Sequence, residues 1–153
     1  MKISKNWLKN YITTNKSDEK LVELFTQLGL ECTFKEVKAL SNDIVVGKVV
    51  SCSKHPDADR LKVCDVQTKE GTFQVVCGAP NARKGMMGVF APTDTYIPGT
   101  DVHLKKSEIR GVESCGMLLS ERELGISDEH EGIIEVDNKH KVGEKFVTIF
   151  NLD

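Results

Sequence analysis

The sequence predicts a mainly β protein with a few short helices at its start, and two observations support this prediction. From about residue 43, short β-branched or alternating segments are separated by turn residues at intervals of roughly eight to twelve residues. Residues 1–31 instead place apolar side chains at helical spacing. The 153 residues, 39% hydrophobic and 29% charged, suit one globular domain with a small appendage. We therefore expect a helical subdomain over residues 1–40 and a β domain over residues 41–153.

Two helices are expected in residues 1–31. Ser4 is the expected N-cap of the first helix, with Ile3 and Leu8 placed as a hydrophobic staple. Ser17 is the expected N-cap of the second helix, and Gly29 supplies its stop. We expect the apolar side chains of this pair to pack between the helices or against the rest of the protein: Trp7, Leu8, Leu21, Leu24, Phe25 and Leu28.

Six segments after the helices are expected to be strands. They are Ile44–Val50, Leu61–Gln67, Phe73–Cys77, Met87–Ala91, Val102–Lys106 and Gly132–Val136. Gly47 inside the first segment indicates a bend or bulge. Ser120–Leu124 is expected to be a single helical turn closed by Gly125. About five to seven short strands in this length fit a small OB-fold β-barrel.

Composition and charge exclude several classes of function. The formal net charge of −2 argues against a generic polyanion binder, although local basic clusters can still bind nucleic acid. The chain has no apolar run of about twenty residues and no apolar signal core, so we expect a cytoplasmic protein with no membrane span. Its five cysteines form no C-x-x-C pair and are expected to be free thiols.

No motif for catalysis or for a cofactor is present in the sequence. The chain lacks a G-x-x-x-x-G-K phosphate loop and a G-x-S-x-G nucleophile elbow. Two clusters combine histidine with carboxylates, His55–Asp59 and Asp128–Glu131, and could hold a cation. We interpret the first as turn chemistry and the second as a solvated loop. We therefore expect no catalytic site, no cofactor and no metal in this chain.

The basic residues carry a more informative signal. Three pairs lie on strands and loops expected to be neighbours: Arg60 and Lys62, Arg83 and Lys84, and Lys105 and Lys106. Small barrels of this type bind oligonucleotides on one face and its bordering loops, although ordinary solubilising charges give the same pattern. Because aromatic residues make up 6% of the chain, we expect recognition by shape and phosphate contact instead of base stacking.

Five motifs, found in order between residues 44 and 136, resemble the tRNA-binding OB-fold domain family. They are Val46–Val49, His55–Leu61, Val76–Asn81, Arg110–Leu118 and Ser120–Gly125. The start of the chain, Met1–Tyr11 with a helix that ends at Leu28–Glu31, resembles the N-terminus of bacterial phenylalanyl-tRNA synthetase beta subunits.

The resemblance implies a non-catalytic tRNA-binding OB-fold module, cut from a longer beta subunit. It implies tRNA contacts at Asn81, Arg110, Ser114 and Met117, and the three basic pairs would form a phosphate-facing fringe around them. The implied partners are tRNA, the remainder of the beta subunit and the catalytic alpha subunit, in a heterotetramer. ATP and Mg²⁺ would be used elsewhere in that enzyme.

Two other functions stay open at this point. The first is a free-standing tRNA-binding protein or chaperone that works as a homodimer. The second is a protein-interaction module of a synthetase, which the near-neutral charge allows. The helical start favours the synthetase subunit, because a free-standing protein need not begin in this way.

Overall fold

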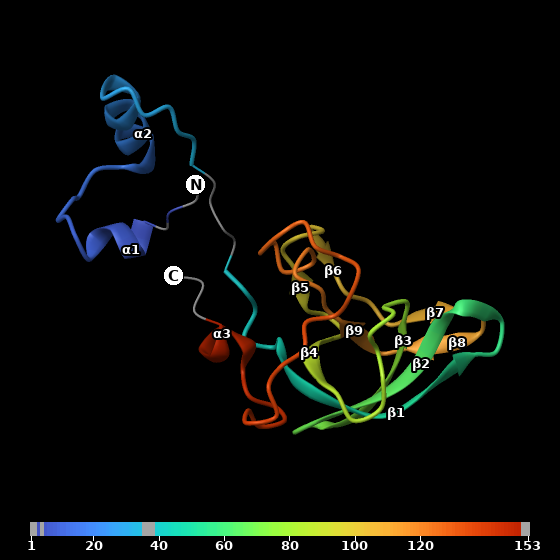
Figure 1. The fold of residues 1–153 in the computed structure, drawn as a ribbon. Helices are drawn as coiled ribbons and strands as arrows, with labels where there is room; N and C mark the ends of the chain where they lie inside the picture. Colours follow the sequence, from blue (N-terminus) through green and yellow to red (C-terminus); the bar gives the residue numbers. More distant parts are fainter. Residues whose placement is uncertain (1–2, 4, 35–38, 151–153) are drawn as a thin grey trace. The chain divides into compact units, whose positions relative to one another are not determined.

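A computed structural model describes residues 3, 5–34 and 39–150 of the chain. The chain forms two compact units: residues 1–38 together with 152–153, and residues 39–151. We call them the helical unit and the β unit, and we describe each by itself (Figure 1).

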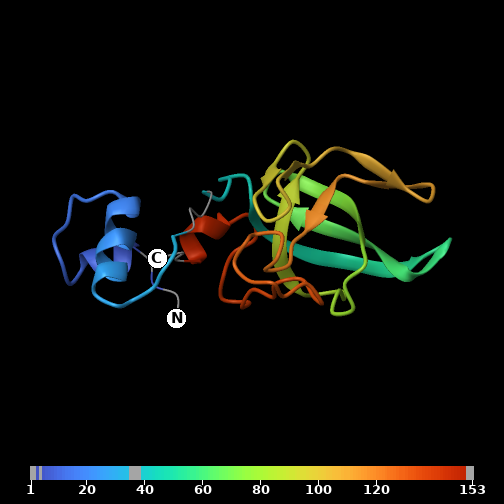
Figure 2. The ribbon, with the colours of Figure 1, turned by 90° about the horizontal axis from the view of Figure 1, so that it is seen from above.

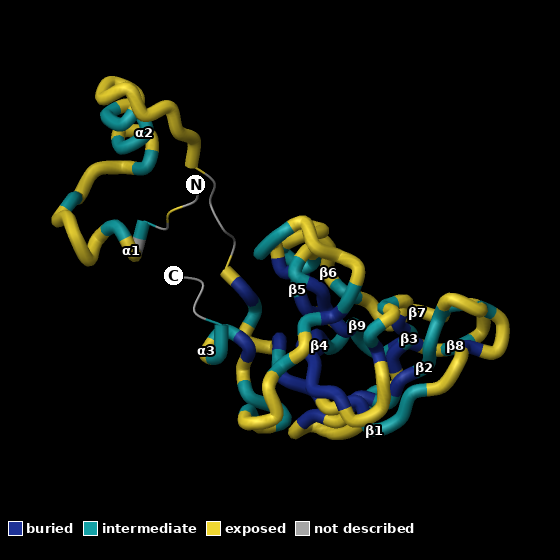
Figure 3. Tube along the Cα trace, viewed as in Figure 1, coloured by how far each residue is buried: buried dark blue, intermediate teal, exposed yellow. Residues whose placement is uncertain are grey.

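The helical unit contains both predicted helices in shorter form, α1 (Lys5–Lys9) and α2 (Asp18–Gln27). Ser17 caps α2 as predicted, since its Oγ accepts the Lys20 N–H at 3.3 Å, whereas Ser4 lies outside the described residues. The expected packing of the apolar residues is seen only in part: Leu21, Leu24 and Phe25 of α2 are half-buried, and no residue of α2 is fully buried. Leu28 is 76% exposed, and Figure 3 shows no buried residue in the described part of this unit. A ten-residue helix beside a five-residue one offers too little apolar surface to enclose a core.

The β unit confirms a mainly β fold with short helices. Its main antiparallel sheet has the strand order β3-β2-β1-β4-β9. These strands are β1 (Val45–His55), β2 (Ala58–Thr68), β3 (Gly71–Cys77), β4 (Met87–Pro92) and β9 (Gly116–Leu118). Two small hairpins add β5 (Tyr96–Ile97) to β6 (Val102–His103), and β7 (Ser107–Ile109) to β8 (Val112–Ser114).

The edges of the main sheet approach each other through the stretch between β8 and β9. The Cys115 N–H donates to the Gln74 carbonyl of β3 at 2.8 Å. Gly116 permits this approach, since a Cβ at its φ of +142° would meet the Phe90 ring at 2.5 Å. The buried side chains form one cluster under β1, β2 and β3, around Val49, Val66 and Phe90, and a second that includes Ile44, Leu119 and Phe146 (Figure 3).

Two expected strands differ from the structure, and in each case a tertiary contact overrides the local pattern. Of the predicted strand Val102–Lys106, only Val102–His103 is observed, as β6, because its partner β5 is two residues long. Gly132–Val136 forms one isolated bridge, since the backbone of Ile133 bonds to a side chain instead of a ladder. Ser120–Leu124 forms the expected turn closed by Gly125 (φ +71°), whose N–H donates to the Arg122 carbonyl at 3.0 Å, and the Glu123 carbonyl accepts the Gly99 N–H at 2.7 Å. A four-residue helix that the sequence did not indicate, α3 (Phe146–Ile149), buries Phe146.

Candidate nucleic-acid interface

The β1–β2 hairpin and the β7–β8 hairpin meet at one end of the β unit (Figures 1 and 2). We call residues 54–60 and 108–112 the joined tips. His55 holds them together: it is 4% exposed, and its Nε2 lies 2.8 Å from the Ile109 carbonyl oxygen. Its Nδ1 accepts the Asp57 N–H at 3.0 Å, so Nε2 carries the proton and donates to Ile109. The predicted turn at His55–Asp59 is therefore a tight hairpin in which His55 pairs with Ala58.

Arg110 lies at the turn of the β7–β8 hairpin. Ile109 pairs with Val112, so the turn consists of Arg110 (φ +49°) and Gly111 (φ +81°). Two left-handed residues in succession match the twist of the flanking strands. The Arg110 Nη1 donates to the Asp57 carbonyl at 2.9 Å, and the exposed guanidinium keeps further N–H donors for a ligand.

The other predicted cations near this end differ in whether a carboxylate of the protein pairs with them. Arg60 on β2 and Lys105 before β7 are exposed, and neither ionic group contacts a carboxylate of the described residues. Lys106 instead pairs with Glu113, Nζ to Oε1, at 2.6 Å. This hydrogen bond holds the pKa of the Glu113 carboxyl below its ordinary value. Arg60 and Lys105 are therefore the freer of these cations.

Two of the four residues that the resemblance implies as tRNA contacts have their polar atoms engaged inside the protein. The Asn81 amide donates to the Ile133 carbonyl at 2.8 Å and accepts the Ile133 N–H at 3.0 Å. Ser114 is 4% exposed, and its Oγ accepts the Val76 N–H at 3.1 Å and donates to the Gly116 carbonyl at 3.2 Å. In this structure both side chains hold loops and strand edges in place.

Met117 and Lys62 also make their contacts within the protein. Met117 is half-buried on β9, packs against the second core cluster, and lines a cavity of about 180 Å³. The Lys62 ammonium donates to the Pro80 carbonyl at 3.0 Å and to the Ala82 carbonyl at 2.7 Å, which ties the loop after β3 to β2. Of the implied contacts, Arg110 is the one that combines an exposed side chain with free donors.

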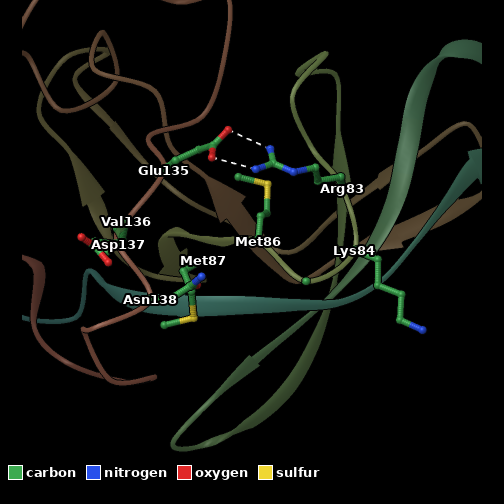
Figure 4. A pocket seen from close by; sticks show the side chains of 9 residues that line it. Arg83, Lys84, Met86, Met87, Glu135, Val136, Asp137 and Asn138 are labelled. Atoms are coloured by element: carbon green, nitrogen blue, oxygen red, sulfur yellow. Dashed lines mark hydrogen bonds and ion pairs between the residues drawn. The ribbon is translucent and has the colours of Figure 1, made fainter.

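Arg83 and Lys84 line a second cavity of about 580 Å³ (Figure 4). Arg83 forms a two-pronged pair with Glu135, at 2.8 and 2.9 Å, which holds the pKa of that carboxyl below its ordinary value. Figure 4 shows Lys84 pointing away from this pair. Adjacent residues of the sequence therefore differ: the charge of Arg83 is neutralised, whereas that of Lys84 is free.

The thiols of β1 and β2 belong to the core. Cys52 pairs with Cys64 across the two strands, and the Cys64 Sγ lies 3.4 Å from the Cys52 Sγ. Burial raises the pKa of the Cys64 thiol to about 12, and burial also raises the pKa of Cys77. All five cysteines are free, as predicted.

The described residues contain neither a candidate metal centre nor a membrane-spanning helix. No group of three or more His, Cys, Asp or Glu side chains among residues 3, 5–34 and 39–150 is arranged to hold a metal ion. Within the same residues, no helix has the length and apolar character needed to cross a membrane.

Sequence reasoning missed the role of His55, although it predicted the turn that this histidine begins. It also missed Lys48, Lys69 and Lys141, which are exposed cations of the β unit. These lysines are far apart in the sequence; the pairing of β1 with β2 and the contact of Lys69 with Gly143 bring their segments together.

These features define an antiparallel β module that presents exposed cations on hairpins and loops. A family model described as a putative tRNA binding domain matches residues 44–145, and the chain belongs to this family. The chain is 48% identical, over its full length, to a phenylalanine–tRNA ligase beta subunit of Mesorhizobium japonicum and 49% identical, over 96% of its length, to one of Ruegeria pomeroyi. It spans about one fifth of the length of these relatives, 19% and 18%.

A solved structure of a Naegleria gruberi RNA ligase shares the fold. It superposes on 71% of this chain and 34% of its own, with a TM-score of 0.50 and 14% identity. At this identity the likeness concerns the arrangement of the chain alone.

Proposed function

We propose that this chain is a non-catalytic tRNA-binding module of a phenylalanine–tRNA ligase beta subunit, which assists tRNA binding for aminoacylation. The observation that carries the proposal is the family match over residues 44–145, which covers the β unit almost completely. The identity of 48% to a beta subunit over the whole chain supports the same assignment for the helical unit.

We propose that the β unit is an OB-fold domain over residues 41–153, after a helical subdomain over residues 1–40. The tRNA-binding residues of the proposal fall into two groups. Arg60, Arg110, Lys84 and Lys105 would contact phosphates directly, because they are exposed and free of carboxylates. The others would support that surface from inside or through ion pairs: Asn81, Ser114, Met117, Lys62, Arg83 and Lys106.

The partners of the proposal are tRNA, the remainder of a beta subunit and a catalytic alpha subunit, in a cytoplasmic heterotetramer. ATP and Mg²⁺ would be bound elsewhere in that enzyme. The proposed role of this chain is to add phosphate contacts, which position an RNA without reading its bases.

The test is an equilibrium titration of the chain with tRNA, followed by fluorescence anisotropy at several salt concentrations. We expect dissociation constants of about 10⁻⁴–10⁻⁶ M. The logarithm of the dissociation constant should rise linearly with the logarithm of the salt concentration, because lysines and arginines that bind phosphates displace counterions from the RNA. A DNA duplex of equal phosphate number is the control, and it should bind more weakly. Absence of tRNA binding at low salt would favour a protein-interaction module instead.

A further inference from the structure

We propose that Lys84, already assigned to phosphate contact above, and four further lysines on the outer face of the β unit form a second phosphate-binding surface for the same RNA. This inference rests on the proposed tRNA-binding function and extends it. We call this surface the lysine face, and its members are Lys48, Lys69, Lys84, Lys141 and Lys145.

Strand β1 is the centre of the lysine face. A Cβ on Gly47 would meet Val66 and Phe90 of the core, so Gly47 faces inward and its neighbour Lys48 faces outward. One residue beyond Lys48, the Val49 carbonyl accepts the Gly85 N–H at 2.7 Å. This bond places Lys84, whose side chain points away from the Arg83–Glu135 pair in Figure 4, beside the same strand.

The segment before α3 brings two more lysines to β1. The Gly143 N–H donates to the Val46 carbonyl at 2.7 Å, and the Val46 N–H donates to the Glu144 carbonyl at 2.9 Å. Lys141 precedes these bonds, and Lys145 forms an isolated bridge with Val45. Both lysines therefore lie within a few residues of Lys48 across a backbone pairing.

Lys69 completes the group from the β2–β3 hairpin. Lys48 pairs with Gln67, so Lys69 follows two residues further along the neighbouring strand. The aliphatic stem of Lys69 lies against Gly143, where an added Cβ would meet its Cγ at 2.3 Å. A side chain at Gly143 would push this stem away. The glycine therefore leaves the space in which Lys69 packs against the segment of Lys141.

The charges of this face are unpaired and exceed the nearby carboxylates. All five lysines are exposed, and no ammonium of the five lies within ion-pair distance of a carboxylate in the described part of the chain. Glu135 and Asp137 line the cavity beside Lys84, but they are already paired with Arg83 and Lys139. The other acids of these segments are Asp65, Glu70 and Glu144. The Asp65 carboxylate accepts the Ser51 hydroxyl at 2.6 Å, and the Glu144 carboxylate accepts the Lys141 N–H at 3.0 Å. The face is thus positive although the chain as a whole is negative.

An RNA is the partner that this arrangement favours. Lysines act as separate point charges, which suits phosphates repeated along a backbone better than one small anion. The joined tips lie at the other end of β1, about seven residues from Lys48 to His55, or roughly 23 Å at about 3.3 Å per residue. One folded RNA is long enough to contact both regions at once.

The test compares the chain with the triple variant K48Q/K69Q/K141Q in tRNA titrations across salt concentration. Removal of each phosphate contact should reduce the slope of log K against log salt by roughly 0.7–0.9, so we expect a reduction of about two units. The triple variant K48R/K69R/K141R keeps the charges and should retain the original slope. K20Q is the control for a lysine already paired, with Glu23 at 2.7 Å, and should change nothing.

The outcomes separate this inference from the proposed function. If the unaltered chain binds tRNA and the Gln triple variant, folded by circular dichroism, keeps the original slope, the lysine face is not an RNA contact. That result would overturn the inference. An acidic protein would then be the favoured partner of the lysine face. If the unaltered chain fails to bind tRNA at low salt, the proposed function itself fails.

Discussion

The two basic regions of the β unit are built in opposite ways. The joined tips contain as many acids as cations: Asp57, Asp59 and Glu108 beside Lys54, Arg60 and Arg110. The tips are held by hydrogen bonds of His55 and Arg110. The lysine face has an excess of unpaired cations, and hydrogen bonds of its backbone, not of its ammonium groups, bring them together.

This difference indicates different contributions to RNA binding. A fixed guanidinium such as Arg110 meets a phosphate in one geometry and contributes orientation. Several free lysines contribute attraction that depends on salt and tolerates many positions of the RNA backbone. We therefore expect the tips to set how an RNA lies and the lysine face to set how strongly its binding depends on salt.

The largest expected effect concerns the strands that connect the two regions. Cys64 lies between them on β2, and a thiol reacts as its thiolate. Its pKa of about 12, against 9.0 for an ordinary thiol, leaves about a thousandfold less thiolate at pH 8. Alkylation at pH 8, read by mass spectrometry, should be slower by about this factor in the folded chain than in urea, with exposed Cys32 as the internal control. Equal rates for the two cysteines in the folded chain would contradict the packing of β1 on β2.

The next largest effect is expected for substitution of His55, the residue that joins the two hairpin tips. His55→Ala removes the partners of the Asp57 N–H and of the Ile109 carbonyl, and should reduce the free energy of unfolding by about 1–3 kcal/mol. The same variant should weaken tRNA binding while leaving its salt slope nearly unchanged. Urea denaturation and anisotropy titrations measure the two quantities.

His55→Gln is the matched control for this prediction. Its amide can still donate to Ile109, so it should recover part of the stability and affinity that the alanine variant lacks. A salt slope that falls in His55→Ala as much as in the lysine variants would remove the distinction between the two regions.

Arg110→Ala should have a moderate effect. It removes an exposed guanidinium fixed on the Asp57 carbonyl, and affinity for tRNA should fall by roughly three- to tenfold. The salt slope should decrease by about one unit at most, because the substitution removes a single phosphate contact. Unchanged affinity and unchanged slope in a folded variant would count against RNA contact at the tips.

The smallest effect is expected for Arg83→Gln. Arg83 already pairs with Glu135 through both guanidinium nitrogens, so a phosphate would have to displace that carboxylate. Affinity for tRNA should stay within about twofold of the original, since exposed pairs of this kind contribute little. A reduction as large as that of Arg110→Ala would show that an ion pair does not remove a cation from the interface.

The sequence predicted the features that depend on local pattern. The Ser17 cap and the segments of β1 to β4 follow from residues close together in the chain. The predicted strand Gly132–Val136 is absent, because the side chain of Asn81, 52 residues away, forms hydrogen bonds with the backbone N–H and carbonyl of Ile133. The weak burial of α2 could not be predicted from its apolar spacing, since burial depends on what the helix packs against.

The candidate interface was predictable in part for the same reason. Arg83–Lys84 and Lys105–Lys106 were visible as adjacent cations, but each pair contains one member that an acid of another segment neutralises. Lys48, Lys69 and Lys141 could not be recognised as a group, because they are far apart in the sequence and a β-ladder and Gly143 bring them together. Charge clusters in the sequence and charge clusters on the surface are therefore different sets.

Backbone amide NMR during a tRNA titration shows directly whether one RNA contacts both ends of β1. We expect shifts for the amides around His55 and Arg110 and, in the same titration, for those around Lys48, Lys69 and Lys141. The amides near Arg83 and Glu135 should move less. Shifts confined to the helical unit, or spread evenly over the β unit without a maximum at either end of β1, would contradict contact at both ends.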